Sequence, residues 1–190
     1  ILLVMLSAAY TIGLEWKRNT QLVLYRISGN SPLTALMGKL LPQTLAFWLI
    51  YILYAVYFYR YLQYPCNSGI MAMIGVGMLT VLGAQGFAAF LFGVCGQMRL
   101  SMCLCSLWGI LSFSLAGFTY PVTAMAPILQ KLSVLFPLRH YYLLYVNQAL
   151  NGYSITYAWH SVLALAIFAL LPLITLHHYR SLFTKVKYIP

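Results

Sequence analysis

The chain has 190 residues, of which 63% are hydrophobic and only 6% are charged, with a mean hydropathy of +0.85. A soluble domain of this length has too little core to bury so much apolar surface, so the composition predicts a membrane protein. The net charge is +10, with a single acid, Glu15. The basic residues flank apolar runs, which indicates contact with anionic lipid headgroups and no nucleic-acid partner.

Five apolar segments are predicted to be transmembrane helices, and they occupy residues 1–14, 41–62, 70–95, 102–120 and 159–179. The last four approach or exceed the ~20 residues that cross a ~30 Å hydrocarbon core. The first is shorter, and we expect it to be a truncated span. The apolar runs are continuous and do not alternate, which favours helices over a barrel. We therefore predict an all-α, polytopic transmembrane helix bundle that forms one domain over 1–190.

Segment 15–28 differs from the spans because its two helical faces differ in polarity. One face carries Trp16, Thr20, Val23, Leu24 and Ile27. The opposite face carries Lys17, Arg18, Gln21, Tyr25 and Ser28. We predict an amphipathic helix on the membrane surface, ended by the turn at 29–32. The alternative is an ordinary basic linker.

The third predicted span is rich in small residues, namely Gly75, Gly77, Gly83, Gly86 and Gly93. Small residues allow helix backbones to approach closely in lipid. The sequence leaves two roles open for them, which are tight helix packing and the lining of a substrate path.

Residues 121–158 form the longest connection, punctuated by Pro121, Pro127 and Pro137. Apolar residues recur in it at helical spacing, and Gly152 is a suitable C-terminal stop. We predict two short external helices within 127–150.

The distribution of basic residues predicts which loops are cytoplasmic and which are external. Alternation of the spans places eight on one side: Lys17, Arg18, Arg26, Lys39, Arg99, Arg180, Lys185 and Lys187. The other side has three: Arg60, Lys131 and Arg139. Because cytoplasmic loops carry the excess of Lys and Arg, we predict that 15–40, 96–101 and the C-terminus are cytoplasmic and that 121–158 is external.

The predicted spans lack the residues that catalysis or ion coupling needs. No Asp, Glu, Lys or Arg lies at mid-membrane depth, where ion-coupled transporters use such groups. His140 and His160 are isolated, the four cysteines lack metal-site spacing, and there is no phosphate-binding glycine loop. We predict no catalytic residue, metal or cofactor. Any uphill transport would then take its energy from another subunit.

Several short motifs follow one another along the chain. They are Glu15-Trp-Lys-Arg-Asn-Thr20, Ser31-Pro32 before Gly38-Lys39, Gly117-Phe-Thr-Tyr-Pro121, Met125-Ala-Pro127, Phe136-Pro137 before His140-Tyr141, and Asn151-Gly152. In this order they resemble membrane subunits of ATP-binding-cassette exporters of the type-2 permease family, which includes bacterial multidrug and polysaccharide exporters. Asn19 and Ala116 stand where that family usually has Gly and Ser. The family has six spans, so the resemblance implies spans two to six here and a missing N-terminal part.

The resemblance implies a transmembrane subunit of an ATP-driven exporter in the bacterial inner membrane. Segment 15–28 would be the coupling helix, which would contact a separate cytoplasmic ATPase subunit through Glu15, Lys17, Arg18 and Thr20. A second permease subunit, identical or different, would complete the pathway between them. The pathway and its external gate would include Gly83, Gly86, Gly117, Pro121, Pro127 and Pro137.

Two other functions stay open on the sequence. One is a membrane scaffold or assembly protein that uses the same spans only as an anchor. The other is an intramembrane lipid-modifying enzyme. A neighbouring reading frame for an ATPase would favour the exporter.

Overall fold

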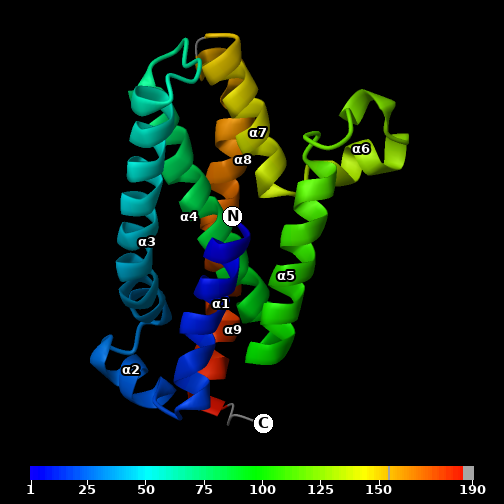
Figure 1. The fold of residues 1–190 in the computed structure, drawn as a ribbon. Helices are drawn as coiled ribbons and strands as arrows, with labels where there is room; N and C mark the ends of the chain where they lie inside the picture. The colour runs from blue at the N-terminus through cyan, green and yellow to red at the C-terminus, as the bar shows by residue number, and fades with distance from the viewer. Residues whose placement is uncertain (154, 186–190) are drawn as a thin grey trace.

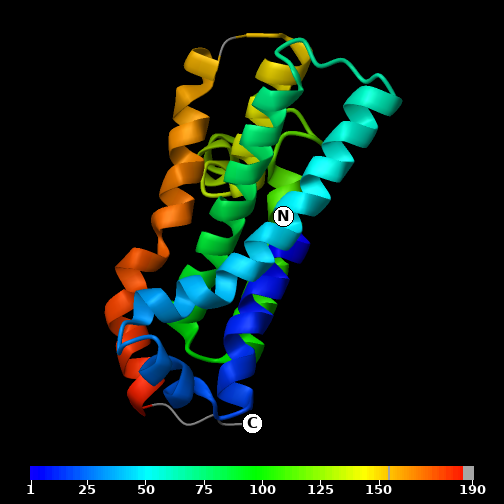
Figure 2. The same ribbon diagram turned by 90° about the vertical axis from the view of Figure 1, so that its left-hand side faces the viewer.

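The computed structural model describes residues 1–153 and 155–185, and these residues form helices and no β-strand. The helices are α1 (Leu2–Lys17), α2 (Gln21–Ile27), α3 (Pro32–Val56), α4 (Ile70–Cys95), α5 (Met98–Leu115), α6 (Pro127–Ser133), α7 (Pro137–Tyr145), α8 (Trp159–Leu170) and α9 (Pro172–Lys185). The longer helices lie side by side in an elongated bundle, whereas α2 lies across one end of it and α6 projects from it (Figures 1 and 2). The predicted all-α class is confirmed.

Four helical stretches of the described chain are long and apolar enough to cross a membrane. They are Pro32–Tyr61, Ile70–Cys95, Met98–Leu115 and Thr156–Phe183. The first continues α3 through a π-helical turn at Tyr57–Tyr61, and the last combines α8 with α9. Together with the apolar composition, these stretches make the chain a multi-pass membrane protein.

Helix α4 occupies the centre of the bundle. It contacts α1, α3, α5, α7, α8 and α9, and in Figure 1 it lies behind α1 with α3 and α5 on either side. Its small residues Ala84, Ala88 and Ala89 are fully buried. Since lipid gives no hydrophobic drive between helices, this close backbone packing is what holds them together.

Three predicted boundaries differ from the structure. Helix α3 begins at Pro32, well before residue 41, because proline fits the first turn of a helix and lacks the N–H that would be unpaired there. Helix α5 covers Met98–Leu115 instead of 102–120, and the chain reverses at Gly117 with φ +92°. The last predicted span is divided at Leu171, since Pro172 cannot donate the next backbone hydrogen bond. Lys187 lies outside the described residues.

The predicted single helix over 15–28 is wrong. Helix α1 continues to Lys17, Asn19 adopts a left-handed φ of +55°, and α2 begins only at Gln21. The predicted faces are also inverted, because Gln21 and Tyr25 are buried, whereas Val23 and Ile27 are 57% and 79% exposed. The physical reason is aromatic packing: the ring of Tyr25 stacks on Phe183 of α9 at 5.6 Å between centroids.

The segment between α5 and α8 forms two helices of different character. Helix α6 projects beside the end of α5 (Figure 1). Helix α7 instead packs between α4, α5 and α8, and its Leu144 is fully buried. The chain therefore turns back into the bundle after α6, and α7 forms part of the bundle itself.

Candidate functional site

The turn between α1 and α2 brings together the four residues predicted to contact an ATPase. Glu15, in the last turn of α1, accepts a hydrogen bond from the Thr20 hydroxyl at 2.5 Å and forms an ion pair with Lys39 of α3. Partial burial raises the pKa of Glu15, but hydrogen bonds from Lys39 and Thr20 and the charges of Lys39 and Arg18 outweigh it and lower this pKa below its usual value. The carboxylate thus joins α1, α2 and α3.

This arrangement corrects the role expected for Glu15. The sequence placed it at the start of a helix, where a carboxylate complements the positive end of the dipole. It lies instead near the C-terminal end of α1, where the dipole disfavours an anion, and Lys39 compensates by pairing with it. Sequence reasoning missed this partner, although Gly38-Lys39 was among the motifs.

Basic and aliphatic side chains are exposed together beside this turn. We call this surface the α1–α2 patch, and it consists of Lys17, Arg18, Leu22, Val23, Arg26 and Ile27. It lies at the end of the bundle where α2 lies below α3 and beside the lower end of α1 (Figure 1). A surface that combines exposed apolar and basic side chains suits a protein partner or an anionic membrane surface.

An aromatic cluster connects the patch to the interior of the bundle. Trp16 lies 5.1 Å from Phe92 of α4 and 5.0 Å from Phe183 of α9 between ring centroids. Tyr179 of α9 donates a hydrogen bond of 2.6 Å to the carbonyl of Ala89 on α4. These packed rings connect α1 and α2 to α4 and α9.

Gly83 and Gly86 lie where α4 meets α8. A Cβ on Gly86 would come 2.4 Å from the carbonyl oxygen of Phe168, and one on Gly83 would come 3.1 Å from that of Leu165. Pro172, four residues after Phe168, leaves the Phe168 carbonyl without its usual helical donor. Close packing, one of the two roles left open by the sequence, accounts for both glycines. A pathway role for them stays a prediction.

The remaining predicted gate residues lie in the connection after α5. Gly117 reverses the chain, Pro121 precedes a short 3₁₀ turn, and Pro127 and Pro137 occupy the first turns of α6 and α7. Pro137 is buried, whereas Pro121 and Pro127 are exposed. The bend between α6 and α7 is closed by two side chains of α7. Arg139 donates to the Ser133 hydroxyl, and Nε2 of His140 lies 2.9 Å from the carbonyl oxygen of Val134.

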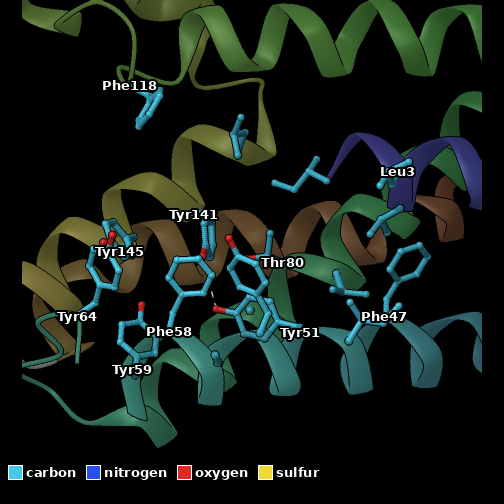
Figure 3. A pocket seen from close by; sticks show the side chains of 18 residues that line it. Leu3, Phe47, Tyr51, Phe58, Tyr59, Tyr64, Thr80, Phe118, Tyr141 and Tyr145 are labelled. Carbon is cyan, nitrogen blue, oxygen red and sulfur yellow. Dashed lines mark hydrogen bonds between the residues drawn. The ribbon is translucent and has the colours of Figure 1, made fainter. Parts of the chain in front are cut away.

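A cavity of about 840 Å³ lies between α1, α3, α4 and α7, and sequence reasoning did not foresee it. Half of its 18 lining residues are aromatic, and six of these are tyrosines: Tyr51, Tyr54, Tyr59, Tyr64, Tyr141 and Tyr145. We call it the tyrosine cavity. In Figure 3 the rings of Tyr59, Tyr64 and Tyr145 gather at one end, and Leu3 and Phe47 lie at the other.

Tyr51 spans the middle of the tyrosine cavity. Its hydroxyl donates to the carbonyl of Met73 on α4 at 3.1 Å and lies 3.5 Å from the hydroxyl of Tyr141 on α7 (Figure 3). The four-residue spacing of Tyr141 and Tyr145 was the available signal, since it places both rings on one face of α7.

The described part of the chain contains no group of three His, Cys, Asp or Glu side chains close enough to hold a metal ion. The two candidate functional sites in this part of the chain are the α1–α2 patch and the tyrosine cavity.

A family model described as "ABC-2 family transporter protein" matches residues 1–176. No curated protein matches the chain. No solved structure matches it.

Proposed function

This chain belongs to the ABC-2 family of transporter proteins, and from that premise we propose that it is the transmembrane subunit of an ATP-driven exporter. The energy comes from a separate cytoplasmic ATPase subunit, which docks on the α1–α2 patch. Membership of the family makes the chain a membrane subunit of an ABC transporter. Docking, coupling and outward transport are the parts that we propose.

The observation that supports docking is the chemistry of the patch. Val23 and Ile27 are exposed at 57% and 79%, and they lie beside the exposed cations Lys17, Arg18 and Arg26. Exposed apolar side chains with polar residues around them are typical of protein or membrane interaction sites. An ATPase surface with an apolar pocket and acidic border would complement them.

The aromatic cluster supplies a route from the docking surface to the spans. Closure of the ATPase on ATP would push α2, and the contacts of Tyr25 with Phe183 and of Trp16 with Phe92 would carry the displacement to α9 and α4. Rigid-body rocking of packed helices is a common form of such transitions. Two subunits, in a homodimer or a heterodimer, would then alternate access to a pathway between them in the bacterial inner membrane.

The proposed coupling is tested by reversing the charge of the patch. Lys17→Glu together with Arg18→Glu adds repulsion from an acidic partner, whereas loss of an exposed ion pair alone costs only ~0–1 kcal/mol. We expect the affinity for the ATPase to fall by at least about tenfold. The measurement is a pull-down of the ATPase by the full-length protein, beside an assay of membrane insertion.

Arg99→Glu is the control, because Arg99 is exposed at the start of α5 and lies outside the patch. It should insert and bind the ATPase as the wild type does. Wild-type ATPase binding and transport by a correctly inserted double variant would remove the α1–α2 patch from the mechanism. A double variant that fails only in insertion would show that the basic residues serve the lipid surface alone, which also contradicts the proposal.

A further inference from the structure

The tyrosine cavity has the size and shape of a small-molecule site. Its volume of about 840 Å³ falls within the range of about 300–1,000 Å³ that such sites occupy. Its floor is buried, with Val4, Ala55 and Thr80 at 5%, 2% and 5% exposure. Its rim is open, since Leu3 and Phe118 are 73% and 66% exposed. It is thus a pocket that is closed at the back and open on one side.

The lining of the pocket changes in polarity along its length. Aliphatic side chains and Phe47 line the end near the start of α1, whereas Tyr59, Tyr64 and Tyr145 line the other end (Figure 3). Within the described part of the chain, the hydroxyls of these three tyrosines form no hydrogen bond to another residue. They are therefore available to a ligand at one end of the pocket only.

The charges near the pocket disfavour an ionic ligand. None of the 18 lining side chains is charged, so an ion bound among them would lose its hydration without gaining an opposite side-chain charge, which is costly. Arg60, next to Tyr59 in the chain, adds a positive charge near the tyrosine end. It opposes the attraction that aromatic faces offer to cations.

These observations define one class of ligand. We propose that the tyrosine cavity, inside a single subunit, binds an uncharged amphiphile and that this class of compound is the transported substrate. The hydrocarbon part lies along Leu3 and Phe47, and the hydroxyl or carbonyl groups of the polar end pair with the hydroxyls of Tyr59, Tyr64 and Tyr145. The apolar rim admits the ligand from the bilayer. This inference rests on the transport function proposed above.

Photolabelling tests the site directly. The full-length protein, reconstituted without ATPase in phosphatidylcholine nanodiscs, is exposed to a monoglyceride that carries a diazirine on its acyl chain. We expect cross-links in the peptides that contain Leu3 and Phe47, because the acyl chain lies along these residues. Unlabelled monoglyceride should compete, whereas an alkyltrimethylammonium of equal chain length should compete at least about tenfold less well.

Two variants of α7 provide a matched comparison. Leu138 lines the cavity, whereas Leu143 on the same helix faces outward at 36% exposure and does not line it. Leu138→Trp should reduce labelling by about tenfold, and Leu143→Trp should leave it unchanged. Tyr145→Phe, which keeps the shape and removes one hydroxyl, should reduce labelling by about fivefold.

Two results would overturn the inference. They are equal labelling of wild type and Leu138→Trp, and competition by the ammonium compound as strong as that by the monoglyceride. With the ATPase added, the monoglyceride should stimulate ATP hydrolysis by the wild type and Leu143→Trp but not by Leu138→Trp. Absence of stimulation in the wild type would reject the amphiphile as substrate.

Failure of the cavity and failure of the coupling can be told apart. Labelling is measured without the ATPase, so it reports on the cavity alone, and the Lys17→Glu and Arg18→Glu double variant should be labelled normally. If that double variant binds the ATPase normally and is labelled as predicted, the proposed coupling is rejected and the proposed ligand site in the tyrosine cavity is retained. Equal labelling of wild type and Leu138→Trp, together with loss of ATPase binding by the double variant, would reject the cavity proposal and support the coupling.

Discussion

The ring of Tyr51 on α3 occupies the space that a side chain at position 77 of α4 would fill. A Cβ on Gly77 would come 1.9 Å from Cε1 of Tyr51. The missing side chain lets Tyr51 reach across to the carbonyl of Met73. The glycine therefore sets the shape of the tyrosine cavity, although glycine itself offers no chemistry to a ligand.

Gly77→Ala should displace Tyr51 and break its hydrogen bond with Met73. Overpacking of this kind costs about 1–3 kcal/mol, so the midpoint of thermal unfolding in detergent should fall. Gly75→Ala is the control, because a Cβ there meets no atom within 4 Å. The double variant with Tyr51→Ala and Gly77→Ala should unfold at a higher temperature than Gly77→Ala alone. Equal midpoints for the two single variants would contradict the packing described here.

Gly86→Ala should destabilise the protein more than Gly83→Ala does. The new methyl group at position 86 would meet the backbone of Phe168 and Ala169 at 2.4 to 2.8 Å, whereas at position 83 the nearest atom lies at 3.1 Å. Backbone atoms yield less easily than the ends of side chains, so we expect a cost of about 1–3 kcal/mol at position 86. The two unfolding midpoints, measured in the same detergent, provide the comparison, and the opposite order would refute it.

The ion pair of Glu15 with Lys39 should make stability depend on pH. The pKa of Glu15 is lowered in the folded protein, so its contribution is present above the pKa of the unfolded chain, about 4.3, and is lost as the pH falls through the lower folded value. Because both side chains are partly exposed, the contribution is at most about 1 kcal/mol. Glu15→Gln should unfold at a lower temperature than the wild type at neutral pH.

The difference in unfolding temperature between the wild type and Glu15→Gln should decrease as the pH falls below about 4. Lys39→Met serves as the second variant, since it removes the partner and keeps Glu15. It should show the same loss at neutral pH. If the unfolding temperatures of the wild type and Glu15→Gln differ by the same amount over the whole acid range, Glu15 does not cause this pH dependence.

The two ends of the bundle should face opposite sides of the membrane. After removal of the native cysteines, a cysteine at Arg26 on α2 should react with an impermeant maleimide only when the inner face is accessible. A cysteine at Tyr157, which is 79% exposed at the other end, should react in intact cells. Reaction of position 26 from outside, with none at 157, would invert the proposed topology. A cysteine at position 187 should likewise react only when the inner face is accessible, since the C-terminus is predicted to be cytoplasmic.

Local sequence determined the class of this protein and most of its helices. Continuous apolar runs of ~20 residues have few solutions in lipid besides a helix, since each backbone polar group needs a partner within the segment. For this reason 70–95 was predicted over the range that α4 occupies. The order of the short motifs, together with the basic flanks, was sufficient to predict the family. These signals depend on neighbours along the chain.

Other features depended on contacts between distant residues. Tyr25 lies on the polar face of a helical wheel, yet it is buried because Phe183 meets it from α9. Gly83 and Gly77 are equivalent small residues in the sequence, but one admits the backbone of α8 and the other the ring of Tyr51. The tyrosine cavity joins side chains from four helices, so only packing creates it. A periodic pattern shows which residues share a face, whereas the neighbour that covers that face is decided by tertiary structure.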